Sequence, residues 1–171
     1  MAERTGLVTF KGNPLTLIGE AVKVGDKLPP FVVVGNDMAP VSPDRFAGKV
    51  LVVSVVPSLD TPICDMQTRR FNAEASGLGS NVSVLTLSMD LPFAQARWCG
   101  AAGATAVTTA SDYMAADFGL KTGLLIKELR LLARAVLVVD GDGVVRYVQL
   151  VPEVAQEPDY DAVLEAVKSL V

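Results

Sequence analysis

Cys64 has the sequence surroundings of a nucleophile. It closes the stretch 57–64 (PSLDTPIC), which lies between an apolar run, Val50 to Val56, and a segment predicted to be helical, Asp65 to Ala75. An apolar run rich in β-branched residues and closed by a proline is typical of a buried strand. Thr61 then suits the N-cap position of the helix, where its hydroxyl accepts a bond from an early helical N–H.

The predicted helix supplies the first source of activation for this cysteine. Pro62 suits the first helical position, because it lacks the N–H that would have no partner there. Cys64 then falls in the first turn, beside free backbone N–H groups and the positive end of the helix dipole. That environment favours the thiolate, which is the nucleophilic form of the side chain. The sequence therefore predicts a reactive cysteine at a strand-to-helix junction.

The composition limits the partners and the compartment. A chain of 171 residues, 50% of them hydrophobic, is expected to form one domain over residues 1–171 with a full core. A net charge of −4 gives no reason to expect nucleic acid or an anionic membrane as a partner. No apolar run approaches the ~20 residues of a membrane span, and residues 1–6 are polar with no apolar signal region after them. The expected location is therefore cytoplasmic.

The lack of histidine excludes several kinds of site. Neither a Ser-His-Asp nor a Cys-His nucleophile pair is possible, and the commonest metal ligand is missing. Cys64 and Cys99, the two cysteines, cannot close a four-thiolate zinc site. We therefore expect no cofactor, and we expect activation by the dipole, hydrogen bonds and a cation. In a reducing compartment such a pair of cysteines is more often redox-active than structural.

The remaining pattern predicts the elements that position these residues. Short β-rich runs predict an N-terminal hairpin, further strands and a closing hairpin around a DGDG turn at 140–143. Helices are expected from Asp90-Leu91-Pro92 to Gly100 or Gly103, and from Asp159 to Val171. This order predicts an α/β, thioredoxin-like fold: a central mixed sheet flanked by helices, with an N-terminal β-hairpin. The expected strands are 7–10, 15–18, 31–34, 50–56, 82–87, 135–139 and 144–150, with a loop that includes a helix cap or turn at 35–43.

The stretch 57–64 resembles the active-site signature of the peroxiredoxins, Pro57-x-x-x-Thr61-x-x-Cys64. With Ser58 and Asp60 included, it resembles more closely the thiol peroxidases, the atypical two-cysteine subgroup of that family. The resemblance covers nearly the whole chain. Its further segments are 69–72 (RRFN), 88–94 (SMDLPFA), 97–99 (RWC), 131–135 (LLARA), 151–153 (VPE) and 157–160 (EPDY).

The resemblance implies a role for each matching residue. Cys64 becomes the peroxidatic cysteine, which attacks a peroxide oxygen and becomes a sulfenic acid. Thr61 holds the thiolate and the peroxide in line through a hydrogen bond, and Arg134 supplies the cation that stabilises the thiolate and polarises the O–O bond. Pro57 shields the sulfur from water. Cys99 is the resolving cysteine, which condenses with the sulfenic acid to an intrachain Cys64–Cys99 disulfide.

The resemblance also implies partners. Thioredoxin would reduce the disulfide by exchange, the helical segments around both cysteines would unwind to let them meet, and the chain would form a homodimer through a face near the active site. The substrate is a peroxide. The apolar residues Leu59, Ile63, Phe93, Trp98 and Leu131 favour an organic hydroperoxide as much as hydrogen peroxide.

Two other functions stay open on the sequence. A thiol-disulfide oxidoreductase acting on protein disulfides is one, although its usual Cys-x-x-Cys motif is missing because position 67 is Gln. A non-enzymatic binding module of the same fold is the other. In that case Cys64 and Cys99 are small buried hydrophobes, and Arg134 is an ion-paired strand residue.

Overall fold

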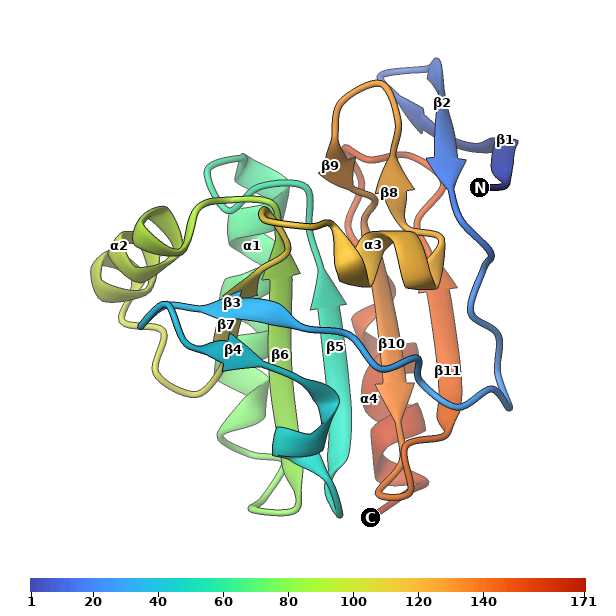
Figure 1. The fold of residues 1–171 in the computed structure, drawn as a ribbon. Helices are drawn as coiled ribbons and strands as arrows, with labels where there is room; N and C mark the ends of the chain where they lie inside the picture. The colour runs from blue at the N-terminus through green and yellow to red at the C-terminus, as the bar shows by residue number, and fades with distance from the viewer.

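A seven-stranded mixed sheet forms the centre of the computed structural model, which describes all of residues 1–171 (Figure 1). Its strands are β3 (Val33–Gly35), β4 (Pro40–Val41), β5 (Val50–Val55), β6 (Val82–Ser88), β7 (Thr108–Ser111), β10 (Ala135–Val139) and β11 (Val145–Leu150). Their order across the sheet is β11-β10-β5-β6-β7-β3-β4. β5, β6 and β7 run parallel, whereas β10, β11, β3 and β4 pair antiparallel.

The central strand β5 is apolar throughout because both faces of the sheet are covered. Successive side chains of a strand point to opposite faces. Leu51, Val53 and Val55 accordingly belong to one hydrophobic cluster, and Val50 and Val52 to the cluster on the other face. The unbroken apolar run is thus a consequence of burial on both sides.

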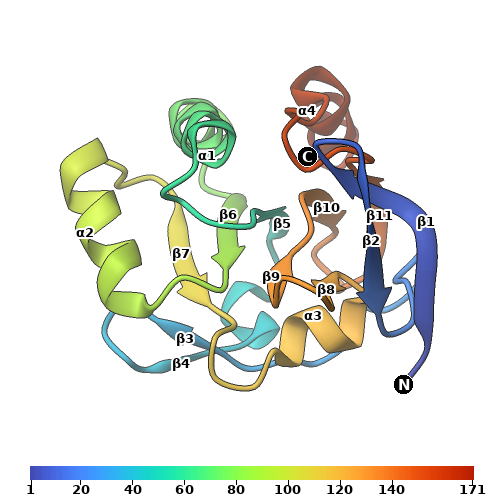
Figure 2. The same cartoon turned by 90° about the horizontal axis from the view of Figure 1, so that it is seen from above.

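Helices supply that cover. α1 (Pro62–Ala75) and α4 (Tyr160–Lys168) lie on one face of the sheet, and α3 (Asp117–Thr122) lies on the other, as Figure 2 shows. α2 (Pro92–Ala102) packs beside α1 near the β7 side of the sheet. None of the four helices is both long and apolar enough to cross a membrane. The predicted α1, α2 and α4 are confirmed, within a few residues at their ends.

The N-terminal hairpin is also confirmed, with strands longer than predicted. β1 (Glu3–Phe10) pairs antiparallel with β2 (Asn13–Ile18) through a two-residue turn. Lys11 and Gly12 both have positive φ in that turn, 49° and 80°, and this left-handed backbone conformation is the one that a two-residue hairpin turn requires. β8 (Leu125–Ile126) and β9 (Leu131–Leu132) extend the pair to a second, four-stranded sheet.

The hairpin is held against the chain that follows β11. The Thr9 N–H donates to the Pro152 carbonyl at 2.8 Å, and the Val154 N–H donates to the Thr9 carbonyl at 2.9 Å. Between them, the Glu153 carboxylate accepts bonds from the Thr9 hydroxyl and from the Gly12 N–H. These contacts fix the hairpin turn next to residues 152–155.

We expect this docking to weaken on acidification. The pKa of Glu153 lies below its usual value because the N–H groups of Ala155 and Gly12 donate to its carboxylate. A lowered pKa in the folded state gives a stabilisation that is present above the unfolded-state value and is lost as the pH falls through the folded-state value. Exchange of the Gly12 amide, corrected for its intrinsic pH dependence, should therefore speed up only at a pH below the ordinary pKa of a glutamate side chain. Glu153→Gln should remove this pH dependence, and a flat profile in the wild type would contradict the assignment.

Several local predictions are wrong. The strand predicted at 31–34 is β3, two residues later, and Phe31 lies in the core outside it. Residues 35–43, predicted as a loop with a helix cap or turn, do end at the cap of a 3₁₀ turn, Pro43–Phe46, but they also contain the unpredicted β4. β7, α3, β8 and β9 are present without having been predicted.

Candidate active site

The predicted strand-to-helix junction is confirmed, and it places Cys64 in the first turn of α1. Thr61 is the N-cap residue, and its carbonyl accepts the Asp65 N–H at 2.9 Å. Pro62 is the first helical residue and Cys64 the third, so the sulfur lies at the positive end of the helix dipole. Cys64 is completely buried against Val56 and Leu59.

The capping bond predicted for Thr61 is not formed. Its Oγ1 donates to the Ser58 carbonyl at 2.9 Å, and the same carbonyl accepts the Thr61 N–H at 3.1 Å. The hydroxyl is therefore turned back toward the loop that precedes the helix. Since its one proton is used there, the oxygen remains available as an acceptor.

The loop before α1 is held by Asp90, which the sequence places at a predicted helix start and in the segment 88–94 of the resemblance. One carboxylate oxygen accepts the Ser58 hydroxyl at 2.7 Å, and the other accepts the Leu59 N–H at 2.8 Å. Ser88 donates to the same carboxylate at 2.7 Å. Asp90 thereby ties the loop carrying Pro57 and Thr61 to the end of β6.

Arg134, directly before β10, contacts the predicted reactive cysteine. Its side chain is 1% exposed. Nη2 donates to Cys64 Sγ at 3.2 Å, Nη1 to Gln67 Oε1 at 2.9 Å, and Nε to the Val154 carbonyl at 2.8 Å.

Arg134 forms no ion pair with a carboxylate, unlike Arg69, Arg70 and Arg146. A buried charge needs a counter-charge, and the Cys64 sulfur is the one ionisable group among its hydrogen-bond partners.

Gln67 is the site residue that sequence analysis missed. It is completely buried, and its Nε2 donates to Ser54 Oγ at 2.9 Å while its Oε1 accepts from Arg134. The signal was its spacing, because a residue three positions after Cys64 lies on the same face of the helix. Gln67 thus fixes the direction of the guanidinium without neutralising it.

Cys99 lies on α2, as predicted, but away from the other thiol. It is half-buried, its Sγ lies 3.4 Å from Thr109 Oγ1, and it lines a separate hollow of about 250 Å³. The two cysteines are not bonded to each other. Cys64 Sγ contacts Arg134, whereas Cys99 Sγ contacts Thr109. Since a disulfide needs Cα atoms within ~7 Å and sulfurs in contact, we expect the two sulfurs to meet only after a movement of the backbone.

A largely apolar cavity of about 580 Å³ is lined by Thr61, Ile63 and Arg134, the neighbours of Cys64, whereas the completely buried Cys64 is not part of its wall. Of the five predicted apolar neighbours, Ile63 and Leu131 line this cavity. Leu59 and Trp98 pack with Cys64 outside it, and Phe93 is 67% exposed. The hairpin and the β8–β9 region supply part of the wall. The lining residues are Phe10, Lys11, Pro57, Thr61, Pro62, Ile63, Ile126, Leu129, Leu131, Arg134, Val154 and Ala155.

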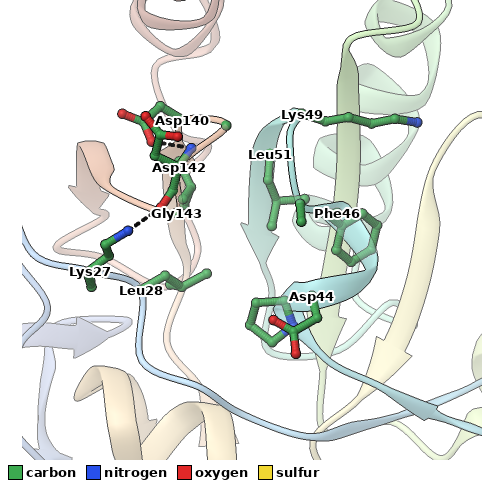
Figure 3. A pocket seen from close by; sticks show the side chains of 13 residues that line it. Lys27, Leu28, Asp44, Phe46, Lys49, Leu51, Asp140, Asp142 and Gly143 are labelled. Atoms are coloured by element: carbon green, nitrogen blue, oxygen red, sulfur yellow. Dashed lines mark hydrogen bonds between the residues drawn. The ribbon is translucent and has the colours of Figure 1, made fainter.

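A further hollow of about 260 Å³ lies at the other end of the sheet, near the start of β5 (Figure 3). Lys27 Nζ donates to the Asp142 carbonyl, and Asp140 pairs with Arg146 at 2.7 Å. Lys27 and Asp140 are therefore bound within the protein, and neither thiol lines this hollow. No group of three or more histidine, cysteine or acidic side chains is placed to hold a metal ion.

Comparison with known proteins identifies the family. Residues 23–164 match the Redoxin family. The chain is 54% identical to a thiol peroxidase of Halalkalibacterium halodurans over 162 residues, covering 95% of this chain and 97% of the relative. It is 53% identical to a thiol peroxidase of Bacillus subtilis over 164 residues, covering 96% and 98%. The chain belongs to the thiol peroxidases of the Redoxin family. The expectation of a peroxiredoxin-type, thiol-dependent peroxidase is thereby confirmed.

Solved structures confirm the thioredoxin-like fold. A peroxiredoxin-like protein of Aquifex aeolicus superposes with a TM-score of 0.89 at 44% identity, covering 98% of this chain and 99% of the other. A thiol peroxidase of Chromobacterium violaceum superposes with a TM-score of 0.85 at 20% identity, covering 95% of each chain. The second similarity concerns the fold alone. The mixed sheet flanked by helices is therefore the shared framework on which this thiol peroxidase site is built.

Proposed function

We propose that this thiol peroxidase reduces hydrogen peroxide and organic hydroperoxides at Cys64. The observation that supports the proposal is the buried Arg134, whose guanidinium contacts the Cys64 sulfur at 3.2 Å and forms no ion pair with a carboxylate. A thiolate at Cys64 balances this charge, and the N-terminus of α1 stabilises the same negative charge. A thiolate is the nucleophile that peroxide reduction requires.

The first step forms a bond between the Cys64 sulfur and one peroxide oxygen. The O–O bond breaks, and the second oxygen leaves as water or an alcohol after taking a proton. The sulfur is oxidised to a sulfenic acid and the peroxide is reduced. Arg134 stabilises the charge that moves from sulfur to the leaving oxygen.

Thr61 and Pro57 line the cavity together with Arg134, which suits the roles proposed for them. Because the Thr61 hydroxyl already donates to the Ser58 carbonyl, its oxygen accepts a hydrogen bond from the peroxide O–H and orients the attacked oxygen toward the sulfur. Pro57 is buried and presents no N–H, so it limits access of water to the sulfur.

The second step uses Cys99 as the resolving cysteine. Its sulfur attacks the sulfenic sulfur, an S–S bond forms, the S–O bond breaks and water leaves. Thioredoxin then reduces the Cys64–Cys99 disulfide through a mixed disulfide. We also propose that residues 1–171 form a single domain, that the chain acts as a homodimer, and that it acts in the cytoplasm, where thioredoxin keeps such thiols reduced.

Stoichiometric oxidation tests this proposal. One equivalent of peroxide should remove both free thiols of each chain and produce a peptide pair joined through Cys64 and Cys99. Thioredoxin with its reductase should restore both thiols. A disulfide that joins two chains, or a thiol count that falls by one, would contradict the intrachain mechanism.

The apolar cavity supports organic hydroperoxides as substrates alongside hydrogen peroxide. Phe10 forms part of the wall from the tip of the N-terminal hairpin. Removing its ring should lower kcat/KM for cumene hydroperoxide by about tenfold, since a bulky tail loses apolar contact. Phe10→Ala should leave hydrogen peroxide reduction unchanged, because that substrate does not reach the hairpin. Equal losses for both substrates would show that the hairpin contributes stability and not selectivity.

A further inference from the structure

A hydrogen bond joins the two segments that carry the cysteines. Trp98 Nε1 donates to Asp65 Oδ1 at 2.8 Å. Asp65 follows Cys64 in the first turn of α1, and Trp98 precedes Cys99 on α2, the helix that lies beside α1 (Figure 1). Each end of this bond is therefore one residue away from a cysteine.

Packing reinforces the connection. The Trp98 side chain packs against the small buried cluster of Val56, Leu59 and Cys64. It also packs against the larger cluster on the α1–α4 face of the sheet, against which Cys99 lies. The indole thus contacts the surroundings of both cysteines.

A third side chain completes this arrangement. Arg69 Nε donates to the Asp65 carboxylate at 2.9 Å, and its guanidinium lies 5.6 Å from the centre of the Trp98 ring. A hydrogen bond to an ionised carboxylate is stronger than one between neutral groups, and a cation over an indole adds attraction. We refer to these three side chains, Asp65, Arg69 and Trp98, as the Asp65–Trp98 contact.

Disulfide formation requires this contact to break. The Cys64 sulfur faces Arg134, and the Cys99 sulfur faces Thr109. The first turn of α1, the Cys99 segment of α2, or both must therefore leave their positions before the sulfurs meet. Asp65 and Trp98 move with those segments, because each is adjacent to a cysteine in the chain.

We propose that Asp65 and Trp98 are positioning residues that hold the closed arrangement and set the rate at which the oxidised Cys64 is resolved by Cys99. This inference rests on the proposed function, since it takes Cys64 as the oxidised and Cys99 as the resolving cysteine. While the contact persists, the sulfenic acid of Cys64 stays beside Arg134, which lines the cavity. A second peroxide can then oxidise it to a sulfinic acid: one peroxide oxygen is transferred to the sulfur, and the other leaves as water or an alcohol. The contact thus also sets the peroxide concentration at which the enzyme is inactivated.

Rapid-mixing measurements on Asp65→Ala and Asp65→Asn test the proposal. The alanine variant should form the Cys64–Cys99 disulfide about tenfold faster, the factor expected from losing one charge-assisted hydrogen bond. It should also need more peroxide for inactivation, by a similar factor. Asparagine keeps an acceptor for Trp98 Nε1, so its rate should fall between those of the wild type and the alanine variant. Trp98 is the one tryptophan of the chain, so its fluorescence reports the opening directly in both variants.

Two further variants make the result decisive. Trp98→Phe keeps an aromatic ring but removes the donor, and it should speed up resolution as Asp65→Ala does. Glu74→Gln breaks the comparable Arg70–Glu74 ion pair further along α1 and should leave resolution unchanged. Wild-type resolution in both Asp65→Ala and Trp98→Phe would overturn the inference. If Cys99→Ser protein treated with peroxide carries no sulfenic acid at Cys64, the proposed function fails, and the inference fails with it.

Discussion

Cys64→Ser protein is expected to reduce peroxide no faster than the uncatalysed background, a fall of at least about a thousandfold. A serine hydroxyl stays protonated in this site, so the helix N-terminus and Arg134 have no anion to stabilise there. The peroxide-dependent burst of one turnover per chain should disappear. The measurement is single-turnover peroxide consumption by the reduced protein in the absence of thioredoxin.

Cys99→Ser is the matched variant for this experiment. It should keep the burst at the wild-type rate, because the oxidation of Cys64 does not involve Cys99, and it should then stop with a sulfenic acid that a dimedone probe labels at Cys64. A burst that survives in Cys64→Ser and disappears in Cys99→Ser would reverse the two roles. A thiol-disulfide oxidoreductase that does not act on peroxides would give no burst in either variant or in the wild type.

The parts of the site predicted from sequence depend on contacts that are local in the chain. The apolar run of β5, the proline at the first helical position and the place of Cys64 follow one another within fifteen residues, so their order determines their geometry. The Thr61 hydroxyl shows the limit of such reasoning. The hydroxyl of an N-cap residue can accept from an N–H of the first helical turn or donate to a carbonyl of the preceding loop. Here the Ser58 carbonyl lies within reach, and the hydroxyl donates to it.

The parts that were missed depend on distant residues. α3 has no local N-cap bond; its Phe118 and Gly119 N–H groups are bound by Asp112, several residues earlier, so no helix-start signal is present. β8 and β9 contain two residues each, too few for an alternating pattern. The cavity wall depends on the docking of Thr9 onto residues 152–154, which no pattern within the hairpin indicates. This explains why Phe10 was not predicted as a wall residue of the cavity.

Arg134→Ala is expected to slow peroxide reduction by about 10²- to 10³-fold, the loss that follows removal of a main donor to a developing oxyanion. One planar guanidinium serves Cys64, Gln67 and the Val154 carbonyl. Lysine keeps the charge but cannot form this fork, so Arg134→Lys should recover only part of the rate. Circular dichroism and a thermal unfolding curve would establish that each variant is folded. A folded Arg134→Ala protein with the wild-type rate would refute the role of the cation.

Gln67→Glu provides the complementary change, because it leaves Arg134 in place and gives the guanidinium a carboxylate. The amide oxygen of Gln67 now accepts from Nη1 at 2.9 Å without carrying a charge. A carboxylate at the same place would attract the guanidinium and add a negative charge near Cys64, which disfavours the thiolate. We therefore expect Gln67→Glu to slow peroxide reduction even though every hydrogen bond to Arg134 can still form. Arg134→Ala removes the positive charge beside the sulfur, whereas Gln67→Glu adds a competing negative charge. If both variants reduce peroxide more slowly, the reactivity of Cys64 depends on a guanidinium that has no other anion as a partner.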